Sequence, residues 1–203
     1  MPLKQKKLVI MNKVIYINNE CNEFNVKENE MLEIYHFVID KSVNTKINLE
    51  GENSKVVYHL SIISNKDNTC KIDVNHVKSN TESKIICHGV NMQNESLEFN
   101  VTGLVPKNVS KCICNEDNEI INLKNGKSVI KPNLLIRNYD TFSNHSAYIG
   151  EFNKEKMFYL ESRGISKEAA TRLLMEGLLL GDANKEEKVV KEFTNYLMEV
   201  YNG

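Results

Sequence analysis

The chain has 203 residues, of which 41% are hydrophobic and 26% are charged, a composition typical of a globular domain with a short appendage. Its 26 basic and 27 acidic residues give a net charge of −1, which argues against nucleic acid or an anionic membrane as the partner. No apolar run approaches the roughly 18 residues of a membrane span, and the run at 8–11 is too short for a signal sequence. We therefore expect a cytoplasmic protein.

The first part of the chain, up to about residue 137, is a series of short strand-like runs. We expect strands at 8–17, 32–38, 56–63, 71–77, 84–92, 96–105, 120–123 and 133–137. Breaks rich in Asn, Asp and Gly separate these runs and mark turns, and no amphipathic helix intervenes, which argues against βαβ units. The pattern predicts an all-β region and leaves open whether it is a sandwich, a barrel or a β-solenoid.

After a last strand at 142–149, the spacing of apolar residues changes from strand-like to helical. Asn153, Ser166 and Asn184 are expected to act as N-caps of three successive helices. Gly164 and Gly181 are expected to end the first two, at about residues 163 and 180. The sequence thus predicts a β domain over residues 1–150 and a C-terminal helical domain over residues 151–203.

His145 lies in the last of the strand-like runs. Strand alternation puts it on one face with the small residues Ser143 and Ala147, so its imidazole has room to bind a metal ion through a neutral nitrogen. The alternative is a structural histidine that bonds a backbone carbonyl, which is the more common role.

The five cysteines are odd in number and unevenly spaced, which predicts reduced thiols rather than a disulfide framework. Cys112 and Cys114 form a Cys-x-Cys motif. On a strand both thiols share one face, about 7 Å apart, which suits two ligands of one metal ion or iron–sulfur cluster. The alternative is two small buried residues that fill a β interior.

Two other motifs predict little chemistry. The segment Gly126-Lys127-Ser128 has the ending of a phosphate-binding loop, but Ile121 stands where the first glycine is required and no helix follows. We expect no nucleotide to bind this chain. A sugar-active β-solenoid enzyme would need carboxylates on one strand face, whereas Glu116, Asp117 and Glu119 are expected in a turn.

Three segments near the C-terminus resemble the SufB/SufD family of iron–sulfur cluster assembly proteins. They are Lys131-Pro132-Asn133-Leu134-Leu135-Ile136, then Asn144-His145-Ser146-Ala147 with Ile149-Gly150, and then Phe158-Tyr159-Leu160 with Ser162-Arg163-Gly164-Ile165. The resemblance implies a mainly β fold, a right-handed parallel β-helix (β-solenoid) with a C-terminal cap of two to three helices. It also implies that the protein is a scaffold rather than an enzyme. This scaffold would carry a transient iron–sulfur cluster.

The resemblance further assigns roles to individual residues. His145 would act at the subunit interface where the cluster forms, in a homodimer or in a heterodimer with another SufB/SufD-like subunit. Ser143 stands where SufD-like members carry a cysteine, and Ser146 stands where SufB-like members carry a glutamate. The late cysteine of SufB-like members falls near Asn118, a few residues beyond Cys114. A non-catalytic oligomeric β-helix whose cluster site has decayed is therefore the alternative function.

The helical tail would bind a SufC-like ABC ATPase, because the equivalent helices of the family dock that subunit. The tail has more apolar residues than one buried stripe requires, which is consistent with a second apolar face for a partner. The residues expected at this contact are Phe158, Arg163, Leu173, Leu174 and Leu178.

Overall fold

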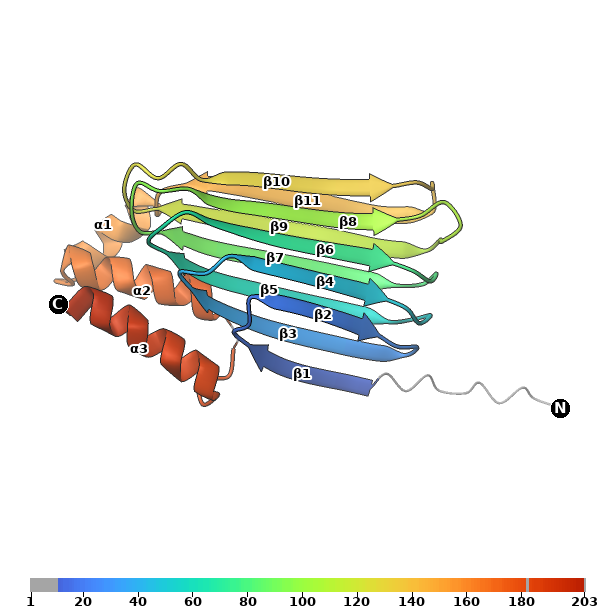
Figure 1. The fold of residues 1–203 in the computed structure, drawn as a ribbon. Coiled ribbons are helices and arrows are strands. Elements are labelled where there is room, and N and C mark those ends of the chain that lie inside the picture. The colour runs from blue at the N-terminus through green and yellow to red at the C-terminus, as the bar shows by residue number, and fades with distance from the viewer. Residues whose placement is uncertain (1–10, 182, 203) are drawn as a thin grey trace.

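The computed structural model describes residues 11–181 and 183–202 (Figure 1). Within them, eleven strands precede three helices. The strands are β1 (Met11–Ile17), β2 (Cys21–Val26), β3 (Glu30–Ile39), β4 (Val43–Leu49), β5 (Lys55–Ser64), β6 (Asn68–His76), β7 (Glu82–Asn91), β8 (Leu97–Val105), β9 (Cys112–Asn122), β10 (Val129–Ile136) and β11 (Thr141–Gly150). The helices are α1 (Lys154–Ser162), α2 (Lys167–Leu180) and α3 (Lys188–Asn202).

The strands form two parallel sheets that face each other. One sheet has the order β1-β3-β5-β7-β9-β11 and the other has the order β10-β8-β6-β4-β2. Successive strands from β1 to β11 thus alternate between the sheets, and each strand pairs in parallel with the strand one coil away. The chain therefore winds as a β-solenoid, as the resemblance implies, and is neither a sandwich of antiparallel strands nor a closed barrel.

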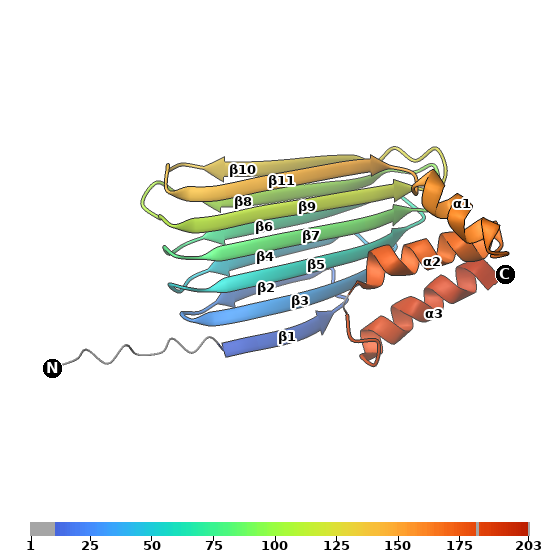
Figure 2. The same ribbon diagram turned by 180° about the vertical axis from the view of Figure 1, so that it is seen from behind.

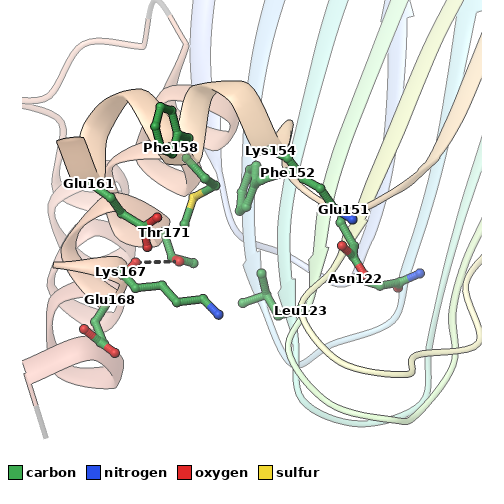
Figure 3. A pocket seen from close by; sticks show the side chains of 11 residues that line it. Asn122, Leu123, Glu151, Phe152, Lys154, Phe158, Glu161, Lys167, Glu168 and Thr171 are labelled. Atoms are coloured by element: carbon green, nitrogen blue, oxygen red, sulfur yellow. Dashed lines mark hydrogen bonds between the residues drawn. The ribbon is translucent and has the colours of Figure 1, made fainter. Parts of the chain in front are cut away.

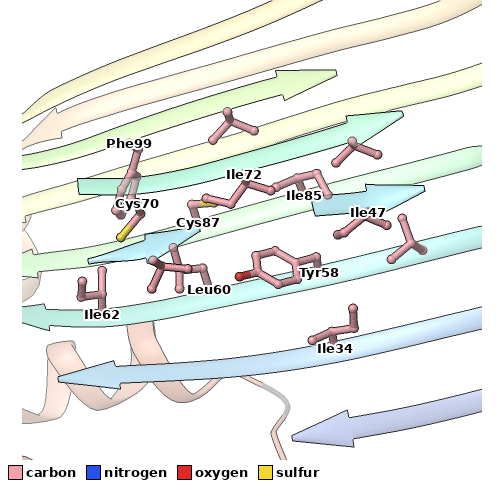
Figure 4. Close-up of a cluster of buried hydrophobic side chains, with 14 of the residues drawn as sticks. Ile34, Ile47, Tyr58, Leu60, Ile62, Cys70, Ile72, Ile85, Cys87 and Phe99 are labelled. Atoms are coloured by element: carbon pink, nitrogen blue, oxygen red, sulfur yellow. The ribbon is translucent and has the colours of Figure 1, made fainter. Parts of the chain in front are cut away.

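The interior of the solenoid is filled by stacked rows of side chains, one from each coil (Figure 4). In one row Ile34, Tyr58 and Ile85 are Cα partners on β3, β5 and β7, and all three are buried. The Tyr58 hydroxyl lies 2.7 Å from Nδ1 of His36, whose Nε2 donates to the Asn19 carbonyl. Burial lowers the pKa of His36 to about 4, so the ring is neutral and accepts from Tyr58.

The strand pattern was partly misread from the sequence. The short strands β2 and β4 were not predicted, and β9 begins at Cys112 rather than near residue 120. The segment that contains Glu116 and Asp117 is therefore the middle of a strand and not a turn, which corrects that expectation. Alternation sends Glu116 into the interior, where it is buried, and leaves Asp117 exposed. Glu116 thus faces the interior while Asp117 and Glu119 share the outward face, so the three carboxylates do not gather on one face of the strand.

Helices α2 and α3 pack against the outer face of the six-stranded sheet, at the carboxyl ends of its strands (Figure 2). Phe193 of α3 packs on Phe37 of β3 with ring centroids 5.1 Å apart. Ser61 Oγ donates to the Leu179 carbonyl, 2.6 Å away, and His88 Nδ1 donates to the Leu178 carbonyl, 2.9 Å away. Two strands thus satisfy carbonyls that the end of α2 leaves without intrahelical partners. None of the described helices is long and apolar enough to cross a membrane.

The predicted helix ends are largely confirmed. Asn153 accepts hydrogen bonds from the backbone N–H groups of Glu155 and Lys156, and Ser166 accepts from that of Ala169. Gly164 has a φ of +83° just after α1, a conformation that favours glycine. The third helix begins at Lys188 and not directly after Asn184, because residues 185–187 form a turn.

Candidate functional site

The solenoid ends in an exposed last coil made of β10 and β11. In the described residues each is the last strand of its sheet, and both lie at the same end of the solenoid (Figure 1). Most side chains of β11 are exposed, in contrast to the alternating burial of β9. The side chains of the last coil are thus accessible to a ligand or a partner.

His145 lies at the middle of β11. It is the Cα partner of Glu116 on β9, just as Ser143 is the partner of Cys114. Paired residues of a parallel ladder point to the same face, so His145 faces the side of the interior. Because no further coil covers it among the described residues, its side chain is exposed.

Cys112 and Cys114 both point into the interior from β9 and are about 1% exposed. Cys112 Sγ lies 3.3 Å from the Thr81 hydroxyl and 3.5 Å from the Ser110 carbonyl oxygen, at the corner where the strand begins. Burial raises the pKa of Cys114 to about 11, so its thiol is protonated at neutral pH. A metal ion would have to displace that proton.

Glu116 is a residue that sequence reasoning missed. Its side chain is 3% exposed, and burial raises its pKa to about 8. The Gly103 backbone amide favours the charged form, but among the described residues neither carboxyl oxygen has a hydrogen-bond partner of ordinary geometry. The signal that could have found it is the alternation Cys-x-Cys-x-Glu-x-Asn-x-Ile over 112–120, which continues the face of the two cysteines.

The predicted ligands do not form a closed site within one chain. In the part of the chain that the structure describes, no group of three or more His, Cys, Asp or Glu side chains has the spacing to hold a metal ion. Cys112 and Cys114 are brought together on β9, and His145 is brought next to Glu116 on the neighbouring strand. Ser143 faces inward beside Cys114, whereas Ser146 points outward and donates to Asp117.

Helix α1 is the least anchored element of the helical tail. None of its residues is buried, and Phe158 and Tyr159 are 72% and 57% exposed. A helix of nine residues is marginal in isolation, so its capping residues and a contact surface have to stabilise it. Arg163, just after the helix, lies over the Tyr159 ring at 5.1 Å.

Two grooves flank α1. The first, of about 700 Å³, lies between α1, the start of α2 and the corner after β9, and Phe152 and Phe158 line it (Figure 3). The second, of about 630 Å³, is lined by Leu173, Leu174 and Leu178 of α2. Most of the residues predicted for partner binding therefore line the grooves, and Arg163 lies at the end of α1.

Helix α2 divides its apolar residues between a buried face and an exposed face. Met175 and Leu179 are buried, whereas Leu173, one of the residues expected at the partner contact, is 42% exposed. The buried stripe of α2 is completed by Ala170 and Leu180. The exposed apolar face of this helix is thus centred on Leu173.

Comparison with known proteins points to one family. The model of the SUF system FeS cluster assembly SufBD core domain matches residues 16–178. The chain is 32% identical over 111 residues to the iron–sulfur cluster assembly protein SufD of Bacillus subtilis (strain 168), which covers 54% of this chain and 25% of that protein. It is 28% identical over 139 residues to the iron–sulfur cluster assembly SufBD family protein ycf24 of Galdieria sulphuraria, with coverage of 64% and 60%.

The chain spans between a quarter and about three fifths of the length of these relatives. The family match nevertheless begins at residue 16, near the end of β1, and ends at residue 178 in α2, and so includes β2 to β11, His145 and helix α1. The chain therefore belongs to the SufBD core domain family of the SUF iron–sulfur cluster assembly system.

Proposed function

We propose that this chain is a scaffold subunit on which iron and sulfide are assembled into a cluster, with the site at the open end of the solenoid. The observation that carries this proposal is the position of His145, on the exposed last strand and in register with a buried carboxyl. Imidazole nitrogen, cysteine sulfur and carboxylate oxygen are all ligands that iron accepts. The cluster is cargo, so the chain is not an enzyme by itself.

We propose that the site is completed by a second subunit, either another copy or a SufB/SufD-like relative. The described residues of one chain lack a set of three ligands with metal spacing, so further ligands have to come from outside. β11 offers an exposed strand edge with unpaired backbone groups, which favours pairing with another strand. Its outward side chain Phe142, 67% exposed, adds apolar surface for this contact.

We propose that a SufC-like ABC ATPase docks on the grooves beside α1. The exposed aromatic residues of α1 and the exposed Leu173 of α2 supply an apolar contact, and Arg163 and Glu161 supply a charged rim. Helix α2 contacts the solenoid through hydrogen bonds from Ser61 and His88. ATP-driven movement of the helical tail would thereby be transmitted to the strands of the solenoid and would open the subunit interface around His145.

Anaerobic co-purification with the SUF-type ATPase of the same cell tests this proposal, followed by reconstitution with iron and sulfide. We expect a stable complex with visible sulfur-to-iron charge-transfer bands. These bands should be lost in His145→Ala and kept in Asn144→Ala, a control whose side chain points outward from the same strand. A chain that binds neither the ATPase nor a cluster would contradict the proposal.

A second candidate function is a non-catalytic oligomeric β-solenoid within the same assembly. Ser143 and Ser146, at positions where the family pattern carries anionic ligands, and the buried protonated thiol of Cys114 favour it. In that case the ATPase complex would form normally but would hold no cluster in the wild type. The same co-purification experiment thus separates the two candidates.

A further inference from the structure

The turn between β9 and β10 contains an Asn-Gly pair that belongs neither to the cluster site nor to the grooves beside α1. The pair is Asn125 and Gly126, and the Asn125 side chain is exposed. The backbone nitrogen of the glycine can attack the side-chain carbonyl of the asparagine, because glycine has no Cβ to obstruct the approach. Whether this attack occurs in a folded protein depends on the hydrogen bonds that hold the two reacting groups.

Neither reacting group of this pair is held. Among the described residues the Asn125 side chain has no hydrogen-bond partner, and the Gly126 N–H has none either. The flanking backbone is anchored on the turn one coil earlier, because the Asn125 N–H donates to Asn94 Oδ1, 3.2 Å away, and the Lys127 N–H donates to the Glu95 carbonyl, 3.1 Å away. The Asn125 side chain and the following amide can therefore turn towards each other without breaking a hydrogen bond.

Asn53 and Ser54 form a comparable pair at another corner, where both groups are held. Asn53 Nδ2 donates to Asn29 Oδ1, 3.2 Å away. The Ser54 N–H donates to the Gly51 carbonyl, 3.4 Å away. A small residue follows the asparagine in both pairs, so the difference in hydrogen bonding decides which pair can react in the folded chain.

We propose that Asn125 is a site of spontaneous deamidation. The Gly126 nitrogen loses its proton to solvent and attacks Asn125 Cγ, where a C–N bond forms, and the side-chain nitrogen takes up a proton and leaves as ammonia. Water then opens the five-membered succinimide ring at either carbonyl and gives aspartate or isoaspartate. The overall reaction consumes one water molecule and releases one ammonia. It needs no cofactor and does not depend on the proposed scaffold function.

Isoaspartate disturbs the packing beneath Gly126, because it adds one atom to the backbone. A Cβ atom on Gly126 would clash with Asn91 Nδ2 and would lie 2.9 Å from Asn122 Oδ1, so the turn has no room to shift inward. Ser128 Oγ donates to Asn122 Oδ1, 2.6 Å away, and accepts from Asn91 Nδ2, 3.3 Å away. Ser128 directly precedes β10, so the modification loosens the start of that strand and with it the last coil.

Incubation of the full chain in mildly alkaline buffer tests the site, with peptide mapping by mass spectrometry as the measurement. Electron-transfer fragmentation distinguishes isoaspartate from aspartate, and the peptide map separates this site from the Asn-Gly pair at 202–203. We expect Asn125 to react in the folded chain at a rate similar to that in the urea-unfolded chain. Asn53 should react at least about tenfold more slowly in the folded chain than in the unfolded one, since two hydrogen bonds have to break first. A folded chain that keeps Asn125 while the unfolded chain loses it would overturn the proposal.

Two variants test the effect on the last coil. Asn125→Gln suppresses the reaction, because glutamine would have to close a larger ring, and freshly prepared Asn125→Asp carries the new charge on a normal backbone. We expect the β10 amides of the incubated wild type to lose protection from hydrogen exchange. Incubated Asn125→Gln and fresh Asn125→Asp should keep that protection. Full protection in a wild-type sample that contains isoaspartate would overturn the effect on β10, and loss of protection in fresh Asn125→Asp would overturn its assignment to the longer backbone.

Discussion

Glu116 and His145 are partners in the parallel ladder between β9 and β11, so a buried acid lies directly beneath an exposed imidazole. Each is unusual for its position, since both carboxyl oxygens lack a hydrogen-bond partner of ordinary geometry among the described residues and the histidine ends a row that begins with Ile34, Tyr58 and Ile85. Together they mark the place where apolar side chains that stabilise the fold no longer fill the interior of the solenoid. The proposed site thus lies at the end of the solenoid.

Replacement of Glu116 by leucine should stabilise the fold. The change continues the apolar row of Ile85 and removes a buried ionisable group, and exchanges of this kind are worth about 1–4 kcal/mol. Chemical unfolding at neutral pH should show a higher free energy of unfolding than for the wild type. Ile85→Ala, one coil away, should instead lower the free energy of unfolding by about 2–5 kcal/mol. A marked loss of stability in Glu116→Leu would mean that the carboxyl has a structural partner.

The folded chain should lose stability in mild acid because His36 is buried in its neutral form. Its pKa is about 4 in the folded state against the ordinary histidine value of 6.5, so the unfolded chain binds the extra proton as pH falls below 6.5. Stability should therefore fall between pH 6.5 and 4, by about 1.4 kcal/mol per pH unit for this group. Below pH 4 the contribution of His36 should stay constant.

Unfolding curves at pH 7.5 and 5 measure this effect. His36→Gln, which retains a polar side chain beside Tyr58, should be less stable at pH 7.5 but should lose less stability on acidification. An equal loss in the wild type and in His36→Gln would assign the acid sensitivity to other groups, such as the buried His76, whose pKa is also lowered to about 4.

Leu173→Glu should abolish binding of the ATPase without a change in stability. The side chain is 42% exposed and lines the groove between α1 and α2. A carboxylate at this position is therefore solvated in the free chain but would be buried against apolar surface in the complex. Pull-down and thermal unfolding together test this expectation. Met175→Ala is the contrasting variant, since truncation of this fully buried side chain should lower the free energy of unfolding by about 2–5 kcal/mol. ATPase binding by Leu173→Glu at wild-type strength would place the contact elsewhere.

Phe142→Arg should dissociate the proposed dimer at the β11 edge. Phe142 is 67% exposed in the isolated chain, so the arginine should leave the monomer stable while it opposes burial against a partner. Sedimentation velocity of the wild type and the variant measures the change, with Phe142→Leu as a control that keeps an apolar side chain. A wild-type chain that sediments as a monomer at all concentrations would contradict self-pairing.

The sequence predicts the fold only where the interior is apolar. β3, β5 and β7 carry pairs or triplets of adjacent apolar residues and were predicted close to their observed bounds. β4 was missed although Val43, Ile47 and Leu49 face inward, because polar residues interrupt them. One of these, Thr45, is itself inside, where it bonds the Tyr58 hydroxyl. Such a partner comes from another coil and is not visible in the local pattern.

The candidate site was predicted in part for the same reason. Cys112, Cys114 and His145 could be selected by residue type, and alternation correctly gave their faces. Glu116 was placed in a turn, because acidic residues within a strand are rare and the strand was not extended to include it. Its significance depends on burial and on register with His145, which only the arrangement of the coils provides.

The contact between His145 and the cluster can be tested directly by pulsed electron paramagnetic resonance. The protein would be labelled with nitrogen-15 in its histidines, reconstituted anaerobically with its ATPase partner, and reduced to give a paramagnetic cluster. We predict a hyperfine coupling from one imidazole nitrogen that disappears in His145→Gln. A cluster of unchanged yield that shows no histidine coupling would contradict a site at the open end of the solenoid.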